Sequence, residues 1–338
     1  MMRLAVLTRS VDAPSHRIYR ENLVSAFSAV GIEVVPFKRR GPIPRGCDVV
    51  WDPGLGLRPI PPVLRGSPIP IVVTFHGARI FSPMYSAREE WPLARLYHPW
   101  LKRSLLRDRA WFREIVAAVI APSRFAAQEA AEVFDVPPEK VHVIPHGVDH
   151  RLFTPDGDVL VRERPYLLHI YGRNPMKNTE RVIAAYARLP EASRPDLVVI
   201  SPWDWFVPRV RGVVVIRRLL SQRELAGWYR GALGLVAPSL RETFGLTLLE
   251  AMACGCPIIT SDRTGCAEVV GEAAVLVNPY SVEEIARAMQ RVIEDGALRE
   301  RLREQGLIRA GAFSWTRSAA AHKQVFSTVM TEARSPCL

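Results

Sequence analysis

The sequence predicts an α/β protein built from two doubly wound domains, each a parallel sheet with helices on both faces. Short apolar segments alternate with amphipathic helical patterns from Leu4 to Ile144, and the alternation starts again at Tyr166. Such alternation is typical of parallel sheets. The chain has 338 residues, of which 48% are hydrophobic and 23% charged, and this suits two folded domains of ordinary size.

The first domain is expected to cover residues 1–150. A strand at Leu4–Thr8 is followed by a loop and a helix, because Tyr19–Val30 places apolar residues at helical spacing and stops at Gly31. The loop, residues 9–17, contains no glycine, so the fingerprint of dinucleotide enzymes is absent and oxidoreductase chemistry loses its main support. Further strands are expected at Glu33–Phe37, Asp48–Trp51, Ile69–Phe75, Val116–Ala121 and Val141–Ile144.

His76 stands at the carboxyl end of the expected strand Ile69–Phe75, after a stiff loop rich in proline. Ligands bind at the carboxyl ends of the strands in open α/β sheets, which makes His76 a candidate substrate contact. The alternative is a histidine that is only hydrogen-bonded at a strand end. The residues themselves leave both interpretations open.

The second domain is expected to cover residues 151–315, and a helix at about 316–338 is expected to cross back to the first domain. Arg151–Arg164 is interpreted as a linker, and Asp156-Gly-Asp158 within it as a solvated turn rather than a metal site. Strands are expected at Tyr166–Tyr171, Leu197–Ile200, Val213–Ile216, Gly234–Ala237 and Pro257–Ser261, and capping boxes at Ser221 with Glu224 and at Ser281 with Glu284.

Two strand-to-helix turns of the second domain carry charged residues. Arg173 and Lys177 follow one buried strand, and Glu242 and Glu250 flank the turn at Gly245 after another. If a helix begins near Gly245, its free N–H groups carry roughly +0.5 charge and favour phosphate. Two acids beside an anion site suggest a hydroxyl-rich ligand. The alternative interpretation, for the glutamate pair taken alone, is that Glu242 is solvated in a surface loop and Glu250 belongs to the ordinary polar face of a helix.

Composition narrows the class of protein. The longest apolar runs, such as Ile115–Ala121, are too short to span a bilayer, and Met1–Thr8 enters a strand without the apolar region of a signal peptide. We therefore expect a cytoplasmic location. The five cysteines show no Cys-x-x-Cys spacing and are expected to be reduced structural thiols.

The segment 95–113 sets arginines and a lysine against tryptophans, leucines and a phenylalanine. It is compatible with a helix lying on an anionic membrane, which would make the protein membrane-peripheral. The alternative is a helix that packs its apolar stripe on the domain and turns its cations to water.

Four further segments occur in order: Val143–Asp149 (VIPHGVD), Gly172–Asn178 (GRNPMKN), Pro238–Ala253 (PSLRETFGLTLLEAMA) and Ala267–Val270 (AEVV). Together they resemble the GT-B-fold retaining glycosyltransferases of family 4, group 1, which transfer a sugar from a nucleotide-sugar. The resemblance spans most of residues 70–316. It implies two Rossmann-like domains facing a cleft, with the donor bound mainly by the second domain and the acceptor by the first.

The same resemblance implies roles for individual residues. Glu250 would hold the ribose hydroxyls of a UDP- or GDP-linked donor, and His76 would lie near the transferred sugar. Arg173 and Lys177 would neutralise the diphosphate in place of a metal ion, so no metal and no other cofactor are expected. The donor sugar and phosphates would be held by Glu242, counted with His76 as catalytic, and by the backbone of Phe244, Gly245 and Leu246. The acceptor is not identified.

The chain departs from the family pattern in two places that matter. The first loop, Ser10–Arg17, lacks the glycines that commonly contact acceptor and phosphate. Arg173 and Lys177 are separated in sequence by one residue or so less than is usual in the family. The family role is therefore carried over more securely to Lys177 than to Arg173. No carboxylate is nominated for the far face of the sugar, so a double displacement has no nucleophile.

Two rival functions remain. One is a GT-B nucleotide-sugar epimerase or hydrolase, which would act on the donor without an acceptor. The other is a nucleic-acid-binding protein, supported only by the net charge of +11. No zinc finger, helix-turn-helix or aromatic-basic RNA motif accompanies that charge in the sequence, so no nucleic-acid partner is expected.

Overall fold

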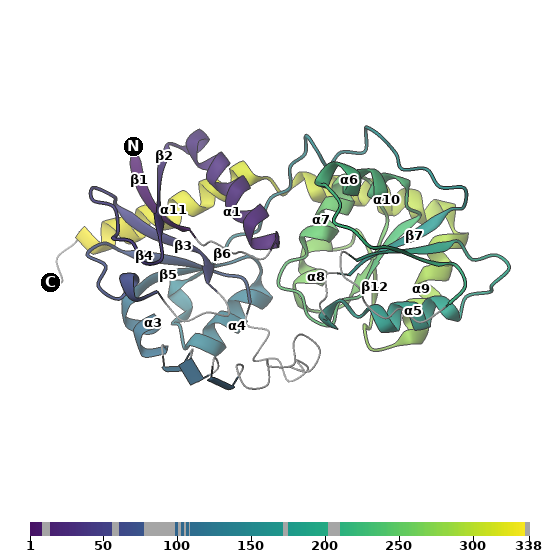
Figure 1. The fold of residues 1–338 in the computed structure, drawn as a ribbon, viewed down its shortest axis with the longest axis horizontal. Helices are drawn as coiled ribbons and strands as arrows, with labels where there is room; N and C mark the ends of the chain where they lie inside the picture. Colours follow the sequence, from purple (N-terminus) through teal and green to yellow (C-terminus); the bar gives the residue numbers. More distant parts are fainter. Residues whose placement is uncertain are drawn as a thin grey trace. The chain divides into compact units, whose positions relative to one another are not determined.

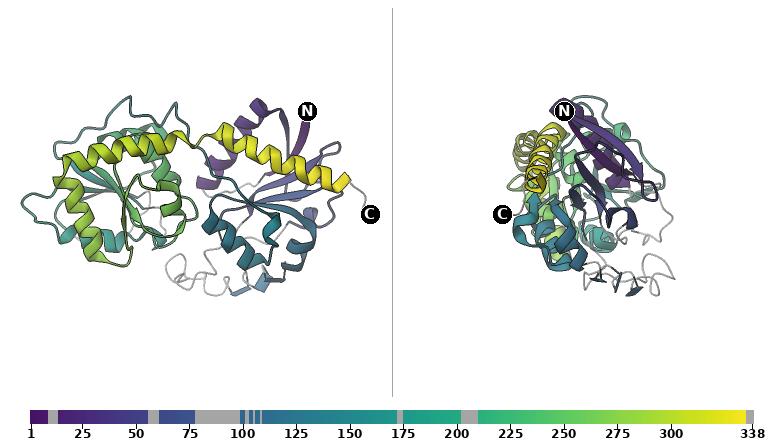
Figure 2. Two further views of the ribbon diagram at one scale, coloured as in Figure 1. Left: turned by 180° about the vertical axis from the view of Figure 1, so that it is seen from behind. Right: turned by 90° about the vertical axis from the view of Figure 1, so that its left-hand side faces the viewer.

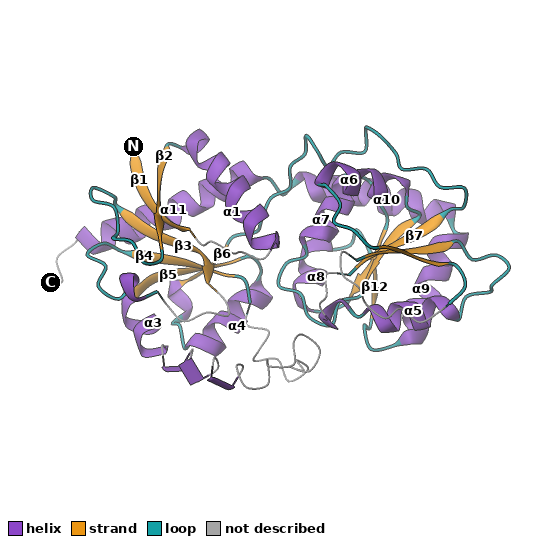
Figure 3. Cartoon of the chain, viewed as in Figure 1, coloured by secondary structure: helices purple, strands orange, loops and turns teal. Residues whose placement is uncertain are grey.

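The structure, a computed structural model, describes residues 1–8, 14–55, 61–77, 99–100, 103–104, 106–107, 109–171, 175–201 and 210–334. The chain divides into two compact units, Met1–Gly147 with Ser314–Leu338, and Val148–Phe313. Each unit contains a six-stranded sheet in which all the pairings are parallel. Helices cover both faces of each sheet (Figures 1 and 3). The predicted fold class, α/β with two doubly wound parallel sheets, is confirmed.

The first unit has the strand order β2-β1-β3-β4-β5-β6. Pro36 lies in β2, an edge strand, where a missing N–H is tolerated. The helix expected at Tyr19–Val30 begins earlier, at Pro14, and tightens into a 3₁₀ turn before Gly31 (φ 74°). The elements are β1 (Met2–Thr8), α1 (Pro14–Phe27), η1 (Ser28–Val30), β2 (Ile32–Lys38), β3 (Val49–Leu55), η2 (Pro62–Leu64), β4 (Ile71–Phe75), α3 (Arg109–Ile115), β5 (Val116–Ala121), α4 (Arg124–Phe134), η5 (Pro138–Lys140), β6 (Val141–Val143) and α11 (Trp315–Arg334).

The second unit has the order β12-β11-β10-β7-β8-β9. The helices α8 and α10 and the strand β12 were not predicted from the sequence. The elements are β7 (Tyr166–Ile170), η6 (Pro175–Lys177), α5 (Thr179–Ala187), β8 (Asp196–Ile200), β9 (Val213–Ile216), α6 (Gln222–Gly231), β10 (Gly234–Ala237), α7 (Leu246–Ala253), β11 (Ile258–Ser261), α8 (Thr264–Val270), β12 (Val275–Val277), α9 (Val282–Glu294) and α10 (Gly296–Gly311).

The two predicted capping boxes have different outcomes. At α6 the box is complete: Ser221 accepts from the Glu224 N–H, and Glu224 accepts from the Ser221 N–H. At α9 the prediction is half wrong. Ser281 accepts from the Glu284 N–H, but the Glu284 carboxylate accepts from the backbone N–H of Asn278 instead. That carboxylate therefore braces the loop before the helix.

The C-terminal helix α11 belongs to the first unit and packs along α1 (Figure 2). A chain of buried hydrogen bonds joins it to the sheet. Burial lowers the pKa of His322 to about 4, so its ring is neutral, and its Nδ1 donates to the Ser318 carbonyl at 2.7 Å. Its Nε2 must then accept from the Tyr19 hydroxyl at 2.8 Å.

The same chain continues into the strands. With the Tyr19 proton directed at His322, the Thr74 hydroxyl 3.1 Å away donates to the Tyr19 oxygen. Thr74 in turn accepts from the indole N–H of Trp51 at 2.9 Å. Each hydrogen bond in this series therefore has a single possible direction. The series joins α1, β3, β4 and α11 and fixes their positions relative to one another.

Gly147 lies where the backbone of the first unit meets the start of α11. A Cβ at this position would collide with the backbone of Ser314 and Trp315. Only glycine fits at position 147 of the segment Val143–Asp149, because two backbone segments approach each other closely there.

Part of segment 95–113 lies outside the described residues. Arg103 and Arg107 are exposed, as is Leu106 at 41%. Contact with a membrane stays a prediction. Among the described residues, the helices are too short or too polar to cross a bilayer.

We expect Gly147→Ala to lower the free energy of unfolding by about 2 kcal/mol or more, because backbone would have to move to admit the methyl group. Gly66→Ala is the matched control: a Cβ there has no described heavy atom within 4 Å, and its effect should stay within about 0.5 kcal/mol. Chemical denaturation followed by tryptophan fluorescence measures both. Equal stabilities for the two variants would contradict the account of Gly147.

Candidate functional site

The strand order of the second sheet reverses at β7. The chain lays down β7, β8 and β9 in one direction and then returns to place β10, β11 and β12 on the other side of β7. In doubly wound sheets ligands bind outside the carboxyl ends of the strands at such a reversal. The segments that follow β7 and β10 contain Lys177 and Glu242, two of the residues singled out in the sequence.

Lys177 and Glu242 meet at this reversal. The Lys177 ammonium donates to Oε2 of Glu242 at 2.6 Å, and the two side chains are 21% and 22% exposed. Burial alone would lower the pKa of Lys177, but the charge and hydrogen bond of Glu242 raise it above the ordinary value, with smaller contributions from Cys266 and Glu250. The lysine is therefore a half-shielded cation that is charged at every physiological pH.

The turn after Glu242 is held against α8. The Gly265 N–H donates to the Glu242 carbonyl at 2.8 Å, and a Cβ on Gly265 would collide with the Thr243 carbonyl. Gly245 caps α7 with a φ of 98°, a conformation that favours glycine. Phe244 is 3% exposed and anchors the turn in the core. The first N–H groups of α7, starting at Leu246, have no carbonyl partner within the helix.

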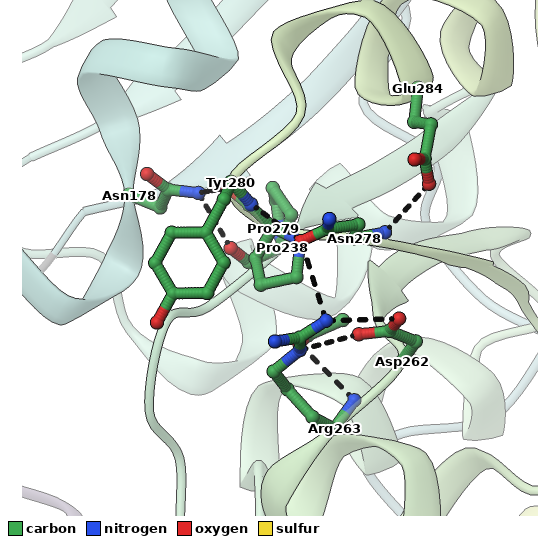
Figure 4. A network of polar contacts seen from close by, with 9 residues as sticks. Asn178, Pro238, Asp262, Arg263, Asn278, Pro279, Tyr280 and Glu284 are labelled. Atoms are coloured by element: carbon green, nitrogen blue, oxygen red, sulfur yellow. Dashed lines mark hydrogen bonds and ion pairs between the residues drawn. The ribbon is translucent and has the colours of Figure 1, made fainter.

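Asn178 ties three loops together at the carboxyl ends of the strands (Figure 4). It is 3% exposed and has a φ of 64°. Its side-chain amide donates to the carbonyls of Pro238 at 3.0 Å and Pro279 at 2.6 Å, which follow β10 and β12. Its oxygen accepts from Arg181 at 3.0 Å. Asparagine suits this position because it tolerates a left-handed backbone and supplies the two donors.

His169 supports the same region from within the sheet. Burial lowers its pKa to about 4, so the ring is neutral. Its Nδ1 donates to the Val236 carbonyl at 2.7 Å, and Nε2 accepts from the Thr179 hydroxyl at 2.8 Å. The ring thereby joins β7, β10 and the start of α5 beneath Lys177. Neither His169 nor Asn178 was predicted, because a polar residue inside an apolar strand or after a lysine does not reveal its partners.

Glu250 lies in the second turn of α7 and is 6% exposed. Its Oε2 accepts from the Tyr229 hydroxyl at 3.2 Å. Burial raises the pKa of Glu250 to about 7, although the Tyr229 hydrogen bond and the Lys177 charge act in the opposite direction. Glu250 was predicted from the sequence as a ligand contact, but its hydrogen-bond partner Tyr229 was not predicted.

His76 lies in the first unit, directly after β4. Its Nε2 donates to the Pro53 carbonyl at 2.7 Å, so Nδ1 is the nitrogen with a lone pair when the ring is neutral. Its ring stacks on His16 of α1, with centroids 4.3 Å apart and planes at 24°, and meets the edge of Tyr19 at 4.8 Å. Arg173 and residues 9–13 lie outside the described residues, and the roles of all these residues stay predictions.

Metal ligands were not expected. In the described ranges, no group of three or more histidine, cysteine, aspartate or glutamate side chains could hold a metal ion. Cys47, Cys254, Cys256 and Cys266 are buried and form no disulfide there. Asp156 and Asp158 are exposed in a turn. Independence from metal stays a prediction.

The sequence matches two described families, "Glycosyl transferases group 1" over residues 214–309 and "Glycosyltransferase Family 4" over residues 39–152. It is 29% identical over 244 residues to a D-inositol 3-phosphate glycosyltransferase of Streptosporangium roseum, covering 64% of this chain and 56% of the relative. It is 31% identical over 278 residues to an MMP alpha-(1->4)-mannosyltransferase of Mycolicibacterium hassiacum, covering 76% and 65%. The chain thus spans less than two thirds of the length of these relatives.

Solved structures share the fold at low identity. Sucrose-phosphate synthase from Thermosynechococcus elongatus matches with a TM-score of 0.75 and 21% identity, over 98% of this chain and 100% of that one. HepE of Anabaena, solved in complex with UDP-glucose, matches with a TM-score of 0.69 and 15% identity, over 98% and 100%.

We expect Glu250→Gln to stabilise the protein in a pH-dependent way. The folded pKa of Glu250, about 7, lies above its ordinary 4.5. The stability contributed by its protonated form is therefore complete below pH 4.5 and is lost as the pH rises to about 7. The variant should match the wild type at pH 4.5 and exceed it by about 2 kcal/mol at pH 8.

Thermal unfolding at both pH values measures this difference. Glu300→Gln, which alters an exposed carboxylate, should leave stability unchanged at either pH. The account of Glu250 fails if Glu250→Gln is no more stable than the wild type at pH 8.

Proposed function

We propose that this chain, which belongs to the family 4, group 1 glycosyltransferases and has their GT-B fold, transfers a sugar from a nucleotide-sugar to an acceptor hydroxyl. Transfer retains the anomeric configuration and needs no metal ion. The observation that carries the proposal is the Lys177–Glu242 pair at the β7/β10 reversal. A cation and an acid held there suit a ligand with both phosphate and hydroxyl groups.

The donor would bind with its diphosphate between Lys177 and the N-terminus of α7. Lys177 is paired with Glu242. A diphosphate would compete for the ammonium group and free the glutamate for sugar hydroxyls. Arg173 is assigned to the same diphosphate on the resemblance alone. The backbone N–H groups of Phe244, Gly245 and Leu246 would contact phosphate or sugar.

Glu250 would hold the ribose. It lies in the second turn of α7, five residues after Gly245, and its carboxylate contacts Tyr229 of α6. A carboxylate accepts hydrogen bonds from vicinal hydroxyls, which is the chemistry that a ribose offers. HepE was solved with UDP-glucose, and we propose a UDP- or GDP-linked donor for this chain.

The reaction would proceed on one face of the sugar. The bond from the anomeric carbon to the diphosphate breaks, and charge develops on the leaving oxygen, where Lys177 stabilises it. The acceptor oxygen bonds to the same face and its proton passes to the diphosphate. The products are a glycoside and a nucleoside diphosphate. His76 is assigned to the transferred sugar, with Nδ1 as its acceptor atom when the ring is neutral.

We expect UDP or GDP to raise the melting temperature of the wild type and ADP to raise it less or not at all, because a ligand that binds only the native state stabilises it in proportion to ln(1 + [L]/Kd). Lys177→Met should abolish that rise. Lys38→Met, in an exposed residue of the first unit, should preserve it. The proposal fails if none of the three nucleotides shifts the wild type.

Activity provides the second test. With the nucleotide-sugar that matches the preferred nucleotide, Lys177→Met and Glu242→Gln should each lower kcat/KM by about 10²- to 10³-fold, the usual effect of removing one group that stabilises developing charge. Release of nucleoside diphosphate measures turnover. Full activity in both variants would remove these residues from the site.

A further inference from the structure

We propose that Tyr229 is a positioning residue of the donor site: its hydroxyl holds Oε2 of Glu250 and so presents Oε1, as a carboxylate, to the ribose hydroxyls. The inference rests on the proposed function for the identity of the ligand. It adds a residue from α6, outside the motifs that indicated the site, and it assigns different tasks to the two oxygens of Glu250.

Tyr229 is fixed before any ligand arrives. It is fully buried (0% exposed) in the core beneath α6 and α7, with its ring centroid 6.3 Å from that of Phe153. A ring enclosed by packed side chains keeps its rotamer. Its hydroxyl is therefore a stationary donor, and the 3.2 Å hydrogen bond fixes the rotamer of Glu250 through Oε2.

The other oxygen is left for a ligand. Among the residues that the structure describes, Tyr229 is the one that donates a hydrogen bond to the Glu250 carboxylate, and it does so at Oε2. A largely buried carboxylate is costly to hold in its charged form, and a hydrogen bond from a ligand hydroxyl to Oε1 offsets part of that cost. The arrangement favours a ligand that brings hydroxyl groups to Oε1.

The titratable groups around Glu250 come from three elements. Tyr229 faces it from α6, Lys177 from the segment after β7, and Cys254 from the end of α7. Burial raises the pKa of Tyr229 well above 10 and that of Cys254 to about 12, so both stay protonated. The phenol can only donate to the carboxylate, and it favours the ionised form of Glu250 against the burial that raises its pKa to about 7.

Removing the phenol hydroxyl should therefore act through the ionisation of Glu250. In Tyr229→Phe the acid should ionise at a higher pH, so at neutral pH more of it carries a proton. Donor binding would weaken near pH 7 and recover at pH 9, where the carboxylate forms even without Tyr229. A residue that only fills the core would weaken binding equally at every pH.

Tyr166→Phe is the matched control. Tyr166 is 2% exposed in the same core, and its hydroxyl donates to the carbonyls of Trp228 at 2.9 Å and Leu160 at 3.3 Å rather than to Glu250. Both variants remove one buried phenol hydroxyl. Their comparison also cancels the titration of the ligand's own phosphate, whose second pKa lies near neutrality.

The first measurement needs no ligand. Carbon-13 NMR of the Glu250 carboxyl, titrated from pH 5 to 9, should show a midpoint about one pH unit higher in Tyr229→Phe than in the wild type or Tyr166→Phe. The same midpoint in all three proteins would overturn the role of Tyr229. Because nucleotide is absent, this result stands whether or not the proposed function is right.

The second measurement is the Kd for UDP or GDP, whichever the wild type binds, between pH 6 and 9. We expect Tyr229→Phe to bind about 5- to 10-fold more weakly than Tyr166→Phe at pH 7, the effect of about one hydrogen bond, and within about 2-fold of it at pH 9. Equal weakening at all pH values, or none, would overturn the proposal. Absence of binding in the wild type would instead overturn the proposed function and, with it, the ligand assigned to Oε1.

Glu250→Gln supplies an independent variant should Tyr229→Phe fold poorly. Its side chain cannot ionise, so the pH dependence of the Kd that arises in the wild type from the titration of Glu250 should vanish. A Kd for Glu250→Gln that still changes with pH as in the wild type, beyond the change due to the ligand's phosphate, would overturn the proposal.

Discussion

The parallel pairing of β7 with β10 is the constraint on which the candidate site depends. These strands are distant in sequence, and their pairing places the segments after both of them at one edge of the sheet. His169 joins the two strands from within, and Asn178 joins the loops that leave them. The Lys177–Glu242 ion pair then closes across the junction. Loss of the strand pairing would separate the cation from the acid, whatever their own environment.

The first unit relies on a different device. Its last described helix, α11, follows the whole second unit in sequence, and two features place it. Gly147 lets its backbone approach closely, and the chain of protons from Trp51 through Thr74 and Tyr19 to His322 sets its register. Because His322 is neutral at ordinary pH, that register does not change with physiological pH. His76 is one of the rings that contact Tyr19, so the fixed position of Tyr19 also helps to order this candidate substrate contact.

Sequence reasoning was most successful where an apolar run is bounded by polar residues. Val116–Ala121, Val213–Ile216 and Gly234–Ala237 were predicted with the bounds that the structure has. The helix α10 was missed because its many arginines hide the apolar stripe. The family and the α/β class were also predicted from the sequence.

The contacts of the site could not be predicted from the sequence. Lys177 and Glu242 are 65 positions apart, and in sequence Tyr229 is indistinguishable from a core aromatic residue. Glu284 is a further example of a contact that the sequence does not reveal. Its spacing from Ser281 predicts a capping box, but its carboxylate accepts from the backbone N–H of Asn278 instead.

The discontinuity of the first unit has a consequence for biosynthesis. The second unit is one continuous stretch, Val148–Phe313, whereas the first unit is completed only by the residues from Ser314 onward. A ribosome therefore delivers every strand of the first sheet long before it delivers α11. Domains generally fold as units during translation, so the second unit can finish while the surface of the first that α11 will cover is still open. Until then a chaperone, or another nascent chain, would meet an apolar face around Phe27 and Trp51 that the finished protein hides.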